Sequence, residues 1–143
     1  MSWARRAWHS SHGQNLVEFA LVTPILVLLL FGIVDFGLVL DHRIALQHGL
    51  REGARYAAVH QGCADIRVRT ADRAGDINCS DVTVTYDPPV PASAGDNVEI
   101  SAPFHYDFPF VGRFGVGTID TTASASARLE MAVPYQGDCT CPP

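Results

Sequence analysis

The sequence contains no lysine, and its ten basic residues, all arginine, are outnumbered by 15 carboxylates, which gives a net charge of −5. A surface that binds nucleic acid needs a cluster of basic side chains that displaces counterions from the phosphates. No such cluster is present. The composition therefore argues against nucleic acid as a partner.

Catalytic and metal-binding motifs are also absent. The sequence has no G-x-S-x-G, Walker loop, G-x-G-x-x-G or H-E-x-x-H. The four cysteines include no C-x₂-C pair, which argues against a zinc site. Histidines occur at 9, 12, 42, 48, 60 and 105 with no H-x₃-H spacing. We predict that the protein is not an enzyme and holds no cofactor or metal.

The apolar residues are instead concentrated near the N-terminus. Residues 16–40 contain 19 Ala, Val, Ile, Leu or Phe among 25 positions. Residues 61–143 carry 11 acids against five arginines, together with eight of the nine prolines and all four cysteines. This distribution predicts an apolar N-terminal rod joined to an acidic head.

The rod is long enough to cross a membrane. A helix over residues 16–40 spans roughly 37 Å, against a hydrocarbon core of about 30 Å. Glu18 and Asp35 flank its charge-free part and are expected near the two interfaces. A buried helix of a soluble protein and a cleaved signal peptide are the alternatives. The first rarely runs so long without a polar face, and the second has a shorter apolar region and an Ala-x-Ala site.

The orientation is not decided by arginine counts on the two sides of the rod. Four cysteines in the distal part favour an oxidising compartment for the head. We therefore expect a single-pass protein of the cytoplasmic (inner) membrane, with a cytoplasmic N-terminus and an extracytoplasmic head that can also end up in an extracellular filament.

A short motif precedes the rod: Gly13 is followed by four residues, Glu18 and the apolar run. This arrangement resembles the processing site of type IV pilins, in which a prepilin peptidase cuts after the glycine. The resemblance implies a leader over residues 1–13 and a new N-terminus at Gln14, a polar residue where many pilins have Phe or Met. The Gln14 amine would then offset the charge of Glu18 in a neighbouring subunit. The alternative is a solvated Glu18 at the N-terminal end of a helix.

A narrower resemblance covers residues 13–60. The E-F-A-L-x-x-P start stands at residues 18–24, the G-I-x-[DE]-F-G end at 32–37, and R-E-G-A-R-Y-A-A-V at 51–59. The segment is similar to the TadE-like family of tight-adherence (Flp) pilus assembly proteins, which are small pseudopilins. The resemblance implies as partners membrane lipid, the prepilin peptidase, other pilin-like subunits in a homo- or hetero-oligomer, and the pilus secretion machinery.

Several positions in the helix are candidates for packing or assembly. Pro24 interrupts the backbone hydrogen bonds, which membrane helices tolerate. Gly32 and Gly37 allow a close helix neighbour. Asp35 can pair with Arg43, pair with a partner subunit, or reach the outer membrane–water interface. A second group forms a charged cluster that is either a subunit contact or a solvated face: Arg51, Glu52 and Arg55.

The head is expected to be β-rich. Residues 82–86, 98–102 and 119–130 alternate with period two, and Pro103 is expected to end the second strand. The fold class is α+β, pilin-like: a long helix packed on a three- or four-stranded antiparallel sheet. The boundaries are 1–13 leader, 14–40 transmembrane helix, 41–62 helix continuation (neck) ending at a Gly62 cap, and 63–143 head. Residues 64–75 fit a short helix or a loop.

The four cysteines allow three pairings if all are bridged. Cys63–Cys79 is the expected bridge, because it closes a loop at the neck. Cys139 and Cys141 are too close together to bridge each other without strain, so they pair elsewhere, cross-link subunits or stay reduced.

Two functional hypotheses follow. The first is a pilin-like protein of tight-adherence pilus assembly, cut after Gly13. The second is an uncut, single-span anchored module outside the cytoplasm, which binds a partner through its acidic loops or through an aromatic run at residues 104–110. Alternating aromatics in a sheet are more often core.

Overall fold

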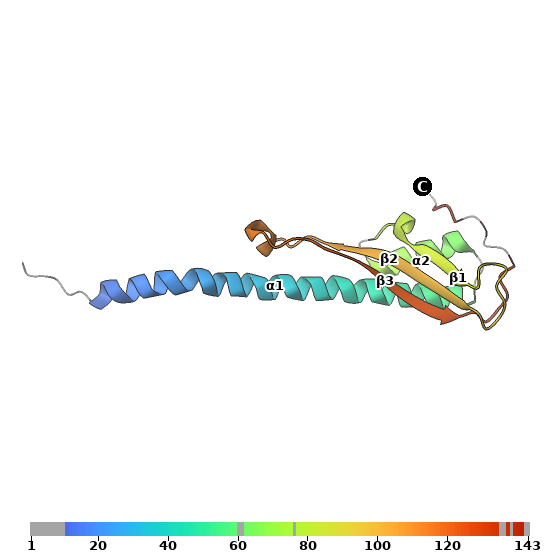
Figure 1. Cartoon of the computed structure of the whole chain (residues 1–143), viewed down its shortest axis with the longest axis horizontal. Helices are drawn as coiled ribbons and strands as arrows, with labels where there is room; N and C mark the ends of the chain where they lie inside the picture. Colours follow the sequence, from blue (N-terminus) through green and yellow to red (C-terminus); the bar gives the residue numbers. More distant parts are fainter. Residues whose placement is uncertain (1–10, 60–61, 76, 135–136, 138, 142–143) are drawn as a thin grey trace, which may run out of the picture.

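The computed structural model of the chain describes residues 11–59, 62–75, 77–134, 137 and 139–141. The predicted leader lies largely outside this part, as does His60. One helix, α1 (Ser11–Ala57), runs the length of the molecule and carries a small α+β head at its C-terminal end (Figure 1). The predicted fold class is confirmed.

Helix α1 contains Pro24 and continues through it. Its first half has exposed apolar side chains, whereas in its second half one face is buried by the head. This buried face recurs every three to four residues, as expected of an amphipathic helix. Its members are Leu46, Leu50, Ala54 and Ala57.

A second helix, α2 (Cys63–Ala74), follows directly. Gly62, expected to cap the end of α1, instead precedes α2 as its N-cap residue, because α1 already ends at Ala57. The two helices approach closely: a Cβ atom at Gly49 would lie 2.4 Å from the Ala74 backbone nitrogen, and one at Gly53 would lie 2.0 Å from the Thr70 hydroxyl oxygen. Glycine is therefore required at both positions for the two helices to be so close.

Three antiparallel strands form the sheet, in the order β1 (Thr83–Asp87), β2 (Asn97–Tyr106) and β3 (Ile119–Arg128). A 3₁₀ turn, η1 (Cys79–Asp81), precedes β1, and another, η2 (Val111–Phe114), lies between β2 and β3. Strand β2 extends beyond the expected end at Pro103. Strand β1 pairs only with residues 97–101, so at Pro103 one edge of β2 is open and a residue without N–H is tolerated there.

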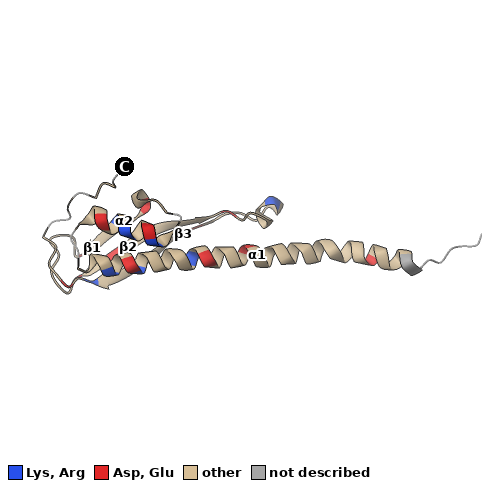
Figure 2. Cartoon of the chain, turned by 180° about the vertical axis from the view of Figure 1, so that it is seen from behind, with Lys and Arg blue, Asp and Glu red and all other residues tan. Residues whose placement is uncertain are grey.

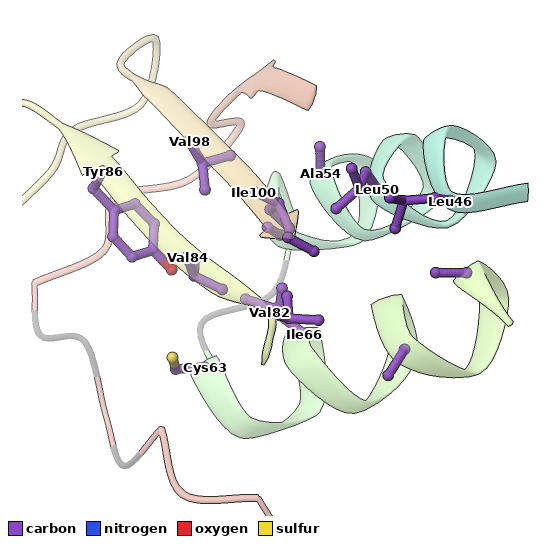
Figure 3. Close-up of a cluster of buried hydrophobic side chains, with 14 of the residues drawn as sticks. Leu46, Leu50, Ala54, Cys63, Ile66, Val82, Val84, Tyr86, Val98 and Ile100 are labelled. Atoms are coloured by element: carbon purple, nitrogen blue, oxygen red, sulfur yellow. The ribbon is translucent and has the colours of Figure 1, made fainter. Parts of the chain in front are cut away.

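The core lies between the sheet and the two helices (Figure 3). Strand β2 supplies alternate buried residues along its full length, as period-two patterning requires. Ile66 of α2 and Leu50 of α1 are fully buried against them. Phe104 and Tyr106 belong to this core, so the aromatic run is mainly structural.

Candidate functional site

The predicted processing segment forms the first turns of α1. Gly13, Gln14 and Glu18 are all exposed. The Gln14 side-chain amide donates a hydrogen bond to Glu18 Oε1 at 3.3 Å, one helical turn away. The Glu18 carboxylate is thus within reach of the residue that would become the N-terminus, and it is exposed within the part of the chain that the structure describes.

The helix that follows exposes a continuous apolar surface. The most apolar stretch of α1 has no buried residue, and Phe19, Leu26 and Ile33 are each more than 60 % exposed. Charged residues gather in the head and the adjoining half of α1 (Figure 2). An exposed apolar surface of this extent marks contact with lipid or with other apolar helices.

Gly32 and Gly37 lie on this helix with open space around them. A Cβ atom at either position would meet nothing within 4 Å. Packing within this chain therefore does not require glycine at these positions, unlike Gly49 and Gly53. A close neighbour from another molecule remains the prediction for both, and Pro24 likewise lies in the uncovered part of α1.

Asp35 has a partner that the sequence did not suggest. The hairpin between β2 and β3 folds back along α1, with η2 at its tip (Figure 1). The backbone amides of Phe110 and Val111 donate to Asp35 Oδ2 at 3.2 and 2.7 Å, and the Phe110 ring stacks on Phe31 at 5.2 Å between centroids. Of the alternatives given for Asp35, pairing with Arg43 is not what the structure shows: the carboxylate accepts hydrogen bonds from these backbone amides instead.

These contacts bury Asp35 almost completely, at 1 % exposure. Its other carboxylate oxygen, Oδ1, has no hydrogen-bond partner within the described part of the chain. The two amide hydrogen bonds attach the tip of the hairpin to α1 at Asp35.

The charged cluster of α1 lies beside the head. Glu52 forms an ion pair with Arg69 of α2 at 3.7 Å, and the Arg69 guanidinium lies over the Tyr56 ring. Arg51 donates to the Gln47 side chain at 3.5 Å, and Arg51 and Arg55 are exposed. Glu52 therefore contributes to the contact between α1 and α2, while Arg51 and Arg55 are exposed on the surface.

The cysteine pairing differs from the expectation. Cys63 is bonded to Cys139, and Cys79 to Cys141, so the expected Cys63–Cys79 bridge is wrong. The reason is topological: the C-terminal segment returns to α2 and η1, which places each of its cysteines beside one of the earlier pair. Arg67 supports this arrangement by donating to the backbone carbonyls of Cys79, Ser80 and Cys139.

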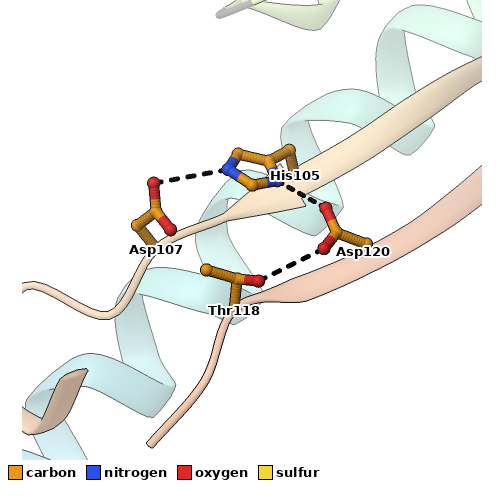
Figure 4. A network of polar contacts seen from close by, with 4 residues as sticks. All are labelled: His105, Asp107, Thr118 and Asp120. Carbon is orange, nitrogen blue, oxygen red and sulfur yellow. Dashed lines mark hydrogen bonds and ion pairs between the residues drawn. The ribbon is translucent and has the colours of Figure 1, made fainter. Parts of the chain in front are cut away.

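An exposed polar network crosses the β2–β3 hairpin (Figure 4). His105 Nδ1 lies against Asp120 Oδ1, and His105 Nε2 is 3.3 Å from Asp107 Oδ2. The Thr118 hydroxyl donates to the other oxygen of Asp120. The hydrogen bond and charge of Asp120, with a smaller effect of Asp107, raise the pKa of His105 above 6.5, and the His105 hydrogen bond lowers the pKa of Asp120.

We expect this network to order the hairpin most strongly in mildly acidic solution. The raised His105 pKa gives a favourable contribution below pH 6.5 that is lost as the pH rises through the pKa of the folded state. The lowered Asp120 pKa gives a second favourable contribution, which is present above pH 3.8 and is lost as the pH falls through the pKa of Asp120 in the folded state. NMR titration of the His105 ring should give a midpoint above 6.5. Asp120→Asn should lower that midpoint more than Asp107→Asn does, and equal midpoints in the three proteins would contradict this assignment.

Within the described residues, no group of three or more His, Cys, Asp or Glu side chains is placed to hold a metal ion. A cleft of about 410 Å³ is lined mainly by α1, by the end of α2 and by β2. The titratable side chains in its lining are those of Asp41, His42, Asp81 and His105.

Helix α1 is long and apolar enough to cross a membrane once, and it carries the small α+β head at its C-terminal end. Residues 13–55 match the family model described as TadE-like protein. The resemblance drawn from the sequence motifs is thereby confirmed over this segment, which begins at Gly13. Neither a curated protein nor a solved structure matches the chain significantly.

Sequence reasoning missed the contact between the hairpin and α1. Two signals for it are present in the sequence: an acidic residue at the end of an apolar run, and an aromatic loop, F-P-F-V-G-R-F, between two strands. Neither signal indicates that the two features meet.

Proposed function

We propose that the protein is a pilin-like component of tight-adherence pilus assembly, cut after Gly13 by a prepilin peptidase. The observation that carries this proposal is the TadE-like match over residues 13–55, which coincides with an uncovered apolar helix. A small α+β head at the far end of that helix is the arrangement expected of a pilin-like subunit.

The proposed boundaries are a leader over residues 1–13, a membrane-spanning part over 14–40, a neck over 41–62 and a head over 63–143. The head is placed outside the cytoplasm. Its two disulfides support this orientation, because disulfides persist in oxidising compartments and are rare in the cytosol.

In an assembly of such subunits, Glu18 has a specific task. An unpaired carboxylate in an apolar environment is strongly unfavourable, and a nearby ammonium group offsets that penalty. The Gln14 amine created by cleavage would supply that ammonium to Glu18 of a neighbouring subunit. The exposed apolar side chains around Glu18 would then pack against lipid before assembly and against other subunits afterwards.

The proposal is tested by N-terminal sequencing of protein recovered from native membranes. We expect the protein to start at Gln14 when the prepilin peptidase is present and to retain its leader when the peptidase is deleted. Gly13→Leu should abolish cleavage, because a branched side chain obstructs access to the backbone at the cut.

Gly37→Leu is the matched control. It makes the same change on the same helix at a position with open space around it, so cleavage should be retained. A wild-type protein that starts at Met1 or Ser2 in the presence of the peptidase would contradict pilin-type processing. That result would favour the second hypothesis, an uncut membrane-anchored binding module.

A further inference from the structure

The tip of the β2–β3 hairpin, residues 108–117, is unusually apolar for a loop in an acidic head. Phe110, Phe114 and Val116 are 41, 67 and 48 % exposed. Arg113 is the single charged residue among these ten. Exposed aromatic side chains grouped in this way mark an interaction surface.

The tip is held at a defined level of α1. The amides of Phe110 and Val111 bind Asp35, and the Phe110 ring stacks on Phe31. Asp35 is 17 residues beyond Glu18, which corresponds to about 26 Å along the helix. A hydrocarbon core of about 30 Å that begins at Glu18 therefore ends close to Asp35 and the attached tip.

From this geometry we propose that the hairpin tip is a second membrane contact of the protein. Phe114, Val116 and the exposed part of Phe110 lie in the headgroup–acyl boundary of the outer leaflet, and Arg113 binds lipid phosphate. The inference rests on the proposed membrane-spanning role of α1. Lipid is the favoured occupant because the tip continues the uncovered apolar surface of α1, where Ile33 and Phe36 are more than 60 % exposed.

The chemistry of the tip fits this position. Exposed Phe side chains can bury their rings at the headgroup–acyl boundary, as the apolar faces of interfacial segments do. An arginine forms bidentate hydrogen bonds with phosphate. Asp35 contributes in a different way: because the tip covers it and donates two amides, its carboxylate is not exposed to lipid at the boundary. The tip thus shields the acidic residue that ends the apolar run and also holds the head close to the bilayer.

The test places a single tryptophan at the tip. Both native tryptophans, Trp3 and Trp8, precede Gly13, so Trp3→Phe and Trp8→Phe leave Phe114→Trp as the only indole. The full-length protein is reconstituted in phosphatidylethanolamine–phosphatidylglycerol vesicles that contain lipids brominated on the acyl chain. We expect bromine close to the headgroup to quench most of the emission from position 114, and bromine near the chain end to quench it less.

Two further single-tryptophan proteins are matched controls. Leu26→Trp, in the middle of the apolar stretch, should be quenched best by bromine near the chain end. Val59→Trp should not be quenched, because Val59 lies just beyond the C-terminal end of α1, where it is 40 % exposed. Quenching at position 26 without quenching at 114 overturns the tip contact alone, whereas no quenching at 26 means that the proposed membrane helix itself is wrong.

The attachment to α1 is tested in the same vesicles. Asp35→Ala removes the acceptor of two amides, so hydrogen exchange at Phe110 and Val111 should accelerate and the quenching at position 114 should weaken. Asp35→Asn keeps an acceptor oxygen. It should therefore retain more of the protection from hydrogen exchange, and more of the quenching at position 114, than Asp35→Ala does. Equal behaviour of the two variants and the wild type would contradict the role given to Asp35.

A second copy of the chain is the competing occupant. If it covered the tip, the emission from position 114 would shift to the blue at high protein density, brominated lipid would not quench it, and dilution with excess lipid would reverse the shift. That result would overturn the lipid contact.

Discussion

Replacing Gly49 with alanine is expected to destabilise the head by about 3 kcal/mol. The added Cβ would lie 2.4 Å from the Ala74 backbone nitrogen and 2.5 Å from its Cα. The obstacle is backbone rather than a flexible side chain, so α1 and α2 must separate. Overpacking of a tight interface typically costs about 1–3 kcal/mol, and a clash with backbone belongs at the upper end. Urea unfolding of the full-length protein in detergent, followed by near-UV circular dichroism, measures the change.

The control for this variant is Gly37→Ala. The same methyl group is added to the same helix, but nothing lies within 4 Å of it. Because alanine is favoured over glycine inside a helix by about 1 kcal/mol, Gly37→Ala should leave the free energy of unfolding unchanged or slightly raised. Equal changes in the free energy of unfolding for the two variants would contradict the role given to the close approach of α2 at Gly49.

The sheet could be predicted from the sequence because its signal is local. Alternating apolar residues mark β1, β2 and β3 in the printed sequence, and the structure confirms all three strands. The expectation that Pro103 ends a strand was wrong, because proline is excluded only from a strand that is paired on both edges. Whether β2 is paired on both edges at Pro103 depends on the length of β1, which stops short of that residue.

The packing of α2 could not be predicted in the same way. Gly49 lies so close to Ala74 that an added Cβ would clash with the backbone of α2. The sequence left residues 64–75 open between a helix and a loop. Without a partner helix, no reason could be given for a glycine at 49 or 53.

In the candidate site, too, features that are local in the sequence could be predicted, whereas contacts between distant residues could not. Gly13, Glu18 and the apolar run are adjacent in sequence, so a motif could identify them. The hydrogen bonds of Asp35 to the hairpin join residues 75 and 76 positions apart. They depend on the length and direction of the β2–β3 hairpin, which no local pattern specifies.

The two disulfides are expected to raise the free energy of unfolding by about 7.5 kcal/mol together, and by about 3 kcal/mol each when the other is intact. Cys63–Cys139 spans 76 residues, which corresponds to about 4.5 kcal/mol of loop-closure entropy. Once Cys79–Cys141 is formed, however, the remaining loop is much shorter, and closing it is worth about 3 kcal/mol. Urea unfolding of each double Cys→Ser variant, and of the quadruple variant, measures these values.

The same variants test the pairing itself. Replacing Cys63 and Cys139 together removes one whole bridge, so Cys79 and Cys141 stay bonded to each other. A thiol reagent should then detect no free thiol in the denatured protein. Replacing Cys63 and Cys79 together breaks both bridges and leaves Cys139 and Cys141 without their partners. Because these two positions are separated by a single residue, a bridge between them is strained, and two thiols should be detected. The opposite result, two thiols in the first variant and none in the second, would establish the Cys63–Cys79 pairing instead.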